Sequence, residues 1–226
     1  MKFRIDGTVM QTVNVELDDG ESVYSESGAM GWMSGNIEMK TESKGGVAGG
    51  LGRMFSGESL FLTNFTAKGG KGFVAFNSEY PGKIIKLELK EGEEMVCEKD
   101  AFMLAQQTVK LSTHLNRKLG AGLLGGEGFV LQKISGPGTA FLNFSGEITE
   151  MELKEGQLLK VDTGCVAMFE PTVKFDIVRV AGAKNFIFGG EGLFLATLSG
   201  PGKVWLQSMP ISGLAGAIRK YIPTKS

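Results

Sequence analysis

An internal repetition constrains the fold of this 226-residue chain more than any single residue does. Three anchors, each a glycine-containing turn beside a short apolar run, recur in the same order. Between the second and third copies every anchor moves by 64 residues, for example from Gly92 to Gly156 and from Gly136 to Gly200. The anchors are Leu17–Glu21, Leu89–Glu93 and Leu153–Gln157; then Gly57–Leu62, Gly126–Leu131 and Gly190–Leu195; then Thr66–Ala75, Ser135–Asn143 and Ser199–Gln207.

Each copy has the pattern of an antiparallel β-element. The 34 glycines separate short runs of Val, Ile, Leu and Phe instead of replacing them, which is typical of strands joined by turns. The sequence therefore predicts an all-β domain of three repeats, at residues 1–80, 81–148 and 149–210. The aromatic strand position of the third anchor aligns Phe73 with Phe141 and Trp205, and we expect these rings to pack in the core or between repeats.

Residues 211–226 form a tail with a different pattern. Apolar side chains recur at helical spacing from Ile211 to Ile218, and Pro223 follows as a stop signal. We predict a short C-terminal helix with Ser212 as its N-cap, although Gly213 weakens the helical pattern.

Charge and composition exclude several classes of function. The 24 basic and 25 acidic residues leave a net charge of -1, so no global positive field favours nucleic acid or anionic lipid. One histidine and two cysteines cannot supply the usual zinc ligand sets, and no cofactor is predicted. Without an apolar signal core or a long apolar span, we expect a cytoplasmic protein that is not integral to a membrane.

Four features of the sequence are distinctive together: the glycine-rich stretch Gly45–Met54, the segment Gly57–Phe61, the later Gly-Glu-Gly copies and the two Ser-Gly-Pro-Gly turns. In these features the chain resembles the altered-inheritance-of-mitochondria family number twenty-four, in its uncharacterised bacterial members. The resemblance implies three tandem copies of a short double-stranded β-helix, the fold of the tryptophan RNA-binding attenuation protein, and a ring of three chains. It implies no catalytic residues.

Ring assembly also follows from the physics of sheet edges. Three units side by side pair their internal edges but leave two edges open at the ends of the array, and open edges must be paired, covered or charged. A cyclic homotrimer would join these ends head to tail.

The candidate binding residues are Glu58, Glu127 and Glu191, one per copy and each directly after a glycine. Three carboxylates related by pseudo-symmetry would suit a cation or a channel. Such glutamates also accept hydrogen bonds from turn amides or pair with a neighbouring base, and both readings stay open.

Other motifs favour structural roles. Gly120–Gly125 matches a dinucleotide fingerprint but precedes a strand, and Gly45–Gly52 lacks the end of a phosphate-binding loop, so it is a packed hairpin or a surface for a membrane or partner. Lys71–Phe76 has only part of an RNA-recognition strand. His114 is expected to be a solvated loop residue, and Cys97 and Cys165 small buried apolar residues.

No convergent catalytic set emerges, so we predict a non-enzymatic, oligomeric β-scaffold that acts through protein or surface interaction. The alternative is a ring that binds a small ligand or RNA in crevices between units, which requires a positive face or polar pockets there. An enzyme would have to rely on carboxylates scattered over the repeats.

Overall fold

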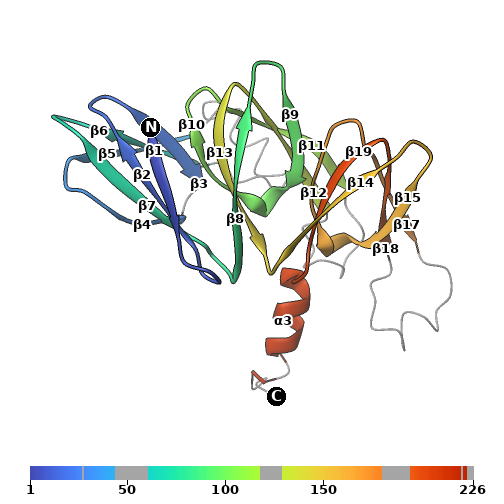
Figure 1. The fold of residues 1–226 in the computed structure, drawn as a ribbon. Coiled ribbons are helices and arrows are strands. Elements are labelled where there is room, and N and C mark those ends of the chain that lie inside the picture. The colour runs from blue at the N-terminus through green and yellow to red at the C-terminus, as the bar shows by residue number, and fades with distance from the viewer. Residues whose placement is uncertain (27, 44–60, 118–128, 180–193, 220, 223–226) are drawn as a thin grey trace.

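The computed structural model describes residues 1–26, 28–43, 61–117, 129–179, 194–219 and 221–222, and Figure 1 shows an array of β-sheets followed by one C-terminal helix. The predicted all-β class and the short helix are confirmed. Within the described residues, two short 3-10 turns, η1 (Lys99–Ala101) and η3 (Thr163–Cys165), interrupt the strands.

The strands form four antiparallel sheets, which we call sheets A to D. Sheet A has the order β1 (Lys2–Asp6), β2 (Thr12–Leu17), β7 (Gly72–Asn77), β4 (Met30–Met33). Sheet B has the order β5 (Ile37–Ser43), β6 (Phe61–Ala67), β3 (Ser22–Glu26), β10 (Phe102–Gln106), β13 (Gly138–Ser145), β8 (Gly82–Leu89). Sheet C has the order β11 (Lys110–Arg117), β12 (Phe129–Ser135), β9 (Glu94–Glu98), β16 (Val166–Phe169), β19 (Gly202–Gln207), β14 (Ile148–Leu153), and sheet D the order β15 (Leu158–Asp162), β18 (Phe194–Ser199), β17 (Lys174–Arg179).

One pairing pattern occurs three times along the chain. Residues 12–77, 82–145 and 148–207, called here the first, second and third units, each contribute two three-stranded half-sheets. One kind of half-sheet has the same strand order in all three units: β2-β7-β4, β8-β13-β10 and β14-β19-β16. The second kind also keeps its own order: β5-β6-β3, β11-β12-β9 and β17-β18-β15. Sheets B and C each join half-sheets from two consecutive units, so neighbouring units share a sheet.

The first anchor forms the same hydrogen-bonded turn in each unit. Gly20, Gly92 and Gly156 lie at φ of about +80°, a region that favours glycine. The side chain that follows each glycine accepts the main-chain N–H three residues before it: Glu21 from Asp18, Glu93 from Lys90 and Gln157 from Lys154, at 3.0, 2.8 and 2.7 Å. The Leu-x-x-Gly-(Glu/Gln) pattern therefore recurs because it closes this turn.

The strand registers correct the predicted aromatic alignment. Leu17, Leu89 and Leu153 pair with Gly72, Gly138 and Gly202, so Ala75 is the counterpart of Phe141 and Trp205. Phe73 lies two residues earlier and is 42% exposed, whereas Phe141 is buried and Trp205 packs against a core cluster. The prediction failed for Phe73 because the segment from Thr66 to Gly72 contains three more residues than those from Ser135 to Gly138 and from Ser199 to Gly202.

Three apolar clusters fill the spaces between consecutive sheets. Val15 and Phe76 of sheet A pack with Phe65 and Phe141 of sheet B. The other face of sheet B packs against sheet C, and sheet C packs against sheet D in the same way. The core is therefore continuous along the array, with each inner sheet buried on both faces.

The C-terminal helix α3 (Ile211–Arg219) follows the last strand and projects from the lower side of the array in Figure 1. The N–H groups of Gly213 and Leu214 donate to the carbonyl oxygen of Pro210, at 2.9 and 3.1 Å. Pro210 is thus the N-cap residue, two residues before the predicted N-cap Ser212. Ser212 lies inside the first turn of the helix. None of the helix side chains is buried.

Candidate functional site

Two strand edges at opposite ends of the array are the first candidate site. Neighbouring units are joined edge to edge by β3 with β10 and by β9 with β16. The corresponding strands at the two ends are β4 in sheet A and β15 in sheet D, and each pairs on one side only within the described residues. Each edge therefore presents main-chain N–H and C=O groups that the equivalent inner strands use for pairing.

The exposed side chain of Trp32 marks the β4 edge. Each of the strands β4, β10 and β16 has a register shift after its first pair, which makes Trp32 the counterpart of Leu104 and Met168. Leu104 and Met168 are 0% and 2% exposed, because the neighbouring sheets cover them. Trp32 is 50% exposed, although it is the largest of the three side chains.

Acidic side chains lie where each joined edge ends. Glu26, Glu98 and Asp162 are the last residues of the equivalent strands β3, β9 and β15. The Gln207 amide donates from Nε2 to Glu98 Oε1 at 2.8 Å and to the carbonyl oxygen of Gly164 at 2.9 Å, so it bridges the second and third units. Asp162 instead accepts the N–H of Gly164 at 2.8 Å.

The carboxyl groups of Glu26 and Glu98, at the two unit boundaries inside the chain, lie in an environment that favours their neutral forms. Burial is the main cause that raises the pKa of Glu98 to about 8, against the hydrogen bond from Gln207. Burial, followed by the nearby charge of Asp100, raises the pKa of Glu26 to about 7, and a hydrogen bond with Gln132 acts in the opposite direction. Both groups therefore change charge near neutral pH.

Two cavities open beside these carboxyls. One, of about 390 Å³, lies between the first and second units and includes Glu26, Ser78 and Asn143 in its lining. The other, of about 510 Å³, lies between the second and third units beside α3, with Glu98 and Arg219 in its lining. Tyr80, Asp100 and Ile211 line both cavities, so the two flank the start of the helix. Pockets between units, which the ligand-binding alternative requires, are present, and each has polar groups in a mainly apolar lining.

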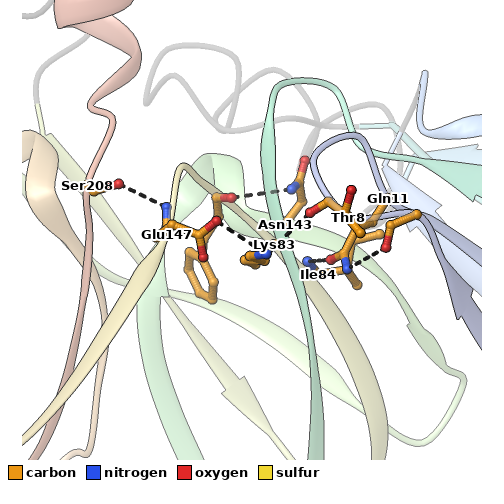
Figure 2. A network of polar contacts seen from close by, with 9 residues as sticks. Thr8, Gln11, Lys83, Ile84, Asn143, Glu147 and Ser208 are labelled. Atoms are coloured by element: carbon orange, nitrogen blue, oxygen red, sulfur yellow. Dashed lines mark hydrogen bonds and ion pairs between the residues drawn. The ribbon is translucent and has the colours of Figure 1, made fainter.

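A band of polar contacts links segments beside the unit boundaries, on the side of the array from which α3 projects, as Figure 2 shows. Lys83 Nζ donates to the carbonyl oxygen of Thr8 at 3.2 Å and forms an ion pair with Glu147 at the same distance. The N–H of Glu147 donates to Ser208 Oγ at 2.9 Å. Lys83, at the start of the second unit, is thus linked to Thr8, which precedes the first unit, and to Glu147, which precedes the third.

The three glutamates predicted as binding residues, Glu58, Glu127 and Glu191, lie outside the described residues, as do Gly45–Gly52 and Gly120–Gly125. Glu26 and Glu98, the carboxylates at the boundaries between units, were missed by the sequence analysis. A signal for them exists, because an acidic residue stands six positions after each turn glycine, Gly20, Gly92 and Gly156.

The remaining candidates have separate surroundings. His114 is exposed on strand β11 instead of in a loop, with its ring 6.5 Å from that of Phe169. Cys97 is buried as predicted, Cys165 is half-buried, and both are free thiols whose pKa is raised by burial. Among the described residues no three His, Cys, Asp or Glu side chains converge as metal ligands.

The sequence profile of the family described as Mitochondrial biogenesis AIM24 matches residues 3–209. The chain belongs to this family. An uncharacterized protein of Streptococcus pyogenes serotype M6 is 31% identical over 235 residues, which cover all of this chain and 93% of the relative. A Streptococcus pyogenes protein solved by X-ray crystallography as a structural genomics target has a TM-score of 0.79 at 28% identity, covering 98% of this chain and 99% of the other. The predicted family is therefore confirmed, in uncharacterised bacterial relatives.

None of the helices in the described part of the chain is long and apolar enough to cross a membrane.

Proposed function

We propose that this AIM24 family protein is a non-enzymatic scaffold. Its chain would be three tandem units of the kind found in the tryptophan RNA-binding attenuation protein, and three chains would close head to tail into a cytoplasmic ring. Strand β15 of one copy pairs with β4 of the next, and the completed ring presents its surface to partner proteins. The observation that carries the proposal is that these two edges are the counterparts of edges that are paired inside the chain.

The inner seams supply the expected register of the ring contact. Leu104 lies opposite Ser25, and Ala105 lies opposite Tyr24, where β10 meets β3. The third unit repeats this register, with Met168 opposite Cys97 and Phe169 opposite Val96. The equivalent pairs between copies are Trp32 with Val161 and Met33 with Lys160. Pairing β15 with β4 would turn sheets D and A into one sheet with the strand order of sheets B and C.

The exposure of the side chains supports the same contact. Leu158 at the start of β15 is 57% exposed, and Trp32 on β4 is 50% exposed. A heterologous contact that covers both edges removes this apolar surface from water, and repeated rotation closes it into a ring with no open edge.

Cross-linking between two variants, each with one introduced cysteine in addition to the buried Cys97, tests the proposed register. In a Cys165→Ser background, a Met33→Cys chain is mixed with a Lys160→Cys chain under mild oxidation. Residues opposite each other on neighbouring strands have Cβ atoms about 5 Å apart, close to the distance a disulfide spans. We expect a covalent dimer of about 48 kDa, twice the 24.2 kDa chain, only in the mixture.

The matched control replaces Lys160→Cys by Leu158→Cys, which lies on the same strand but two residues out of register. It should cross-link poorly, and native mass spectrometry of the unmodified protein should give about 73 kDa, three times 24.2 kDa. Dimers from either variant alone would indicate a symmetric contact, and a 24.2 kDa monomer at micromolar concentration would refute the ring.

The second candidate function is binding in the crevices between units. The cavities beside Glu26 and Glu98 favour it, because they lie at the unit boundaries and combine apolar walls with a few polar groups. When ionised, Glu26 and Glu98 repel phosphate groups, so these crevices suit a small ligand better than RNA. Retention of a bound mass in native mass spectrometry would support this candidate, and retention of a nucleic acid would favour the RNA reading.

A further inference from the structure

The cavity between the first and second units, called here the seam pocket, has an unbalanced set of charges. Glu26, Glu79 and Asp100 line it, whereas none of its described lining residues is basic. Lys99, outside this lining, has its Nζ 3.8 Å from Asp100 Oδ1, and its charge lowers the pKa of Glu26. With both Glu26 and Glu79 ionised, the pocket therefore has an excess of negative charge.

A second feature of the seam pocket is a buried hydroxyl group without a partner. Ser78 is only 5% exposed, and its Oγ has no hydrogen-bond partner among the described residues. The counterpart of Ser78 in the third unit is Ser208, whose Oγ accepts the N–H of Glu147 at 2.9 Å. A buried hydroxyl that lines a cavity and lacks a partner is a group that a ligand can satisfy.

The other walls of the seam pocket are apolar. Ala29, Phe102, Met103 and Ile211 line it together with the acidic residues. A cavity of about 390 Å³ with apolar walls and a few polar groups is of the size and character that holds a small molecule. The ligand should accordingly combine a cationic group with a short aliphatic chain.

We propose that the seam pocket binds a small aliphatic diamine. One ammonium group lies between Glu26 and Asp100 and donates to Ser78 Oγ, the aliphatic chain packs against Phe102 and Met103, and the second ammonium reaches Glu79. The described carboxylates do not converge as ligands of one metal ion, so a ligand with two separated charges matches them better. This proposal concerns one chain and is independent of ring closure.

Isothermal titration calorimetry with butane-1,4-diamine at about pH 8, where its amines are largely charged, tests the proposal. The neutral isostere butane-1,4-diol is the ligand control. We expect the diamine to bind and the diol not to bind. The affinity should weaken roughly tenfold or more in Glu26→Gln and in Ser78→Ala, because each loses a hydrogen bond to a charged group.

Ser78→Ala removes a hydroxyl with no partner in the protein, so it should fold even if Glu26→Gln does not. Glu91→Gln, in the exposed turn between β8 and β9, is the matched control and should bind like the parent. The diamine affinity of the parent should also rise with pH as Glu26 ionises near pH 7 in the field of Asp100, Glu79 and Lys99. Equal binding of diamine and diol, unchanged affinity in Ser78→Ala, or no heat at millimolar diamine would overturn the proposal.

Discussion

Replacing Trp32 by alanine is the sharpest test of ring closure. Trp32 is 50% exposed in the single chain, whereas its counterparts Leu104 and Met168 are almost fully buried by neighbouring sheets. If the next copy supplies the missing neighbour, the exposed half of the indole becomes buried at every seam. A Trp32→Ala ring should therefore dissociate more readily while each chain stays folded.

The size of the effect follows from the exposed area. A tryptophan side chain contributes up to about 250 Å² of contact surface, so half of it is about 125 Å². At about 25 cal/mol per Å², its burial stabilises each seam by about 3 kcal/mol. Because about 1.4 kcal/mol is a tenfold change, the dissociation constant should rise by roughly two orders of magnitude.

Sedimentation equilibrium over a range of protein concentrations measures this constant, and urea unfolding of the separated chain checks the fold. Met39→Ala on β5 is the matched control, because Met39 is 43% exposed on a strand that the proposed contact does not use. An unchanged dissociation constant for Trp32→Ala, or an equal loss in Met39→Ala, would refute the assignment of β4 to the ring seam.

Three further predictions concern the single chain and are measured by urea unfolding. Gly82→Ala should destabilise the fold by about 2 kcal/mol or more, because its Cβ would overlap a main-chain carbonyl oxygen of β13, whereas Gly35→Ala, with nothing near its Cβ, should be close to neutral. Tyr24→Phe should cost about 1–2 kcal/mol by leaving a buried carbonyl without its 2.9 Å hydrogen bond, and the exposed Tyr221→Phe should change nothing. The pKa of Glu98 rises from 4.5 to about 8 on folding. Its contribution to the free energy of unfolding is therefore complete below pH 4.5 and is lost as the pH rises to about 8. Glu98→Gln should flatten this fall, and parallel pH profiles for parent and variant would contradict the buried position of the carboxyl.

The repeated glycines made much of the fold predictable. A glycine at positive φ and the glutamate or glutamine after it are both needed to close the first turn, so the Leu17–Glu21 pattern is preserved in each copy. Short alternating runs between such turns then indicate strands, and the all-β class follows. The C-terminal helix was predictable for the same reason, because its apolar spacing differs from that of the strands.

The sharing of sheets between units was not predictable, because it depends on which edges meet in space. The aromatic alignment failed because Phe73 was matched by residue type, whereas the register follows Gly72, Gly138 and Gly202. Glu26 and Glu98 were missed because an isolated glutamate at the end of a strand looks solvated in sequence. Their burial comes from the neighbouring unit, which is distant along the chain.

Because sheets B and C each take strands from two units, the second unit has no sheet of its own. In strand pairing, the boundary between two units inside the chain and the boundary that we propose between two chains are the same. The number of units, not the number of chains, therefore defines the proposed ring. The peptide bonds between units only determine how many units belong to one chain. A chain cut down to one unit would still present one edge of each kind, and three such pieces could take the place of one chain in the same ring.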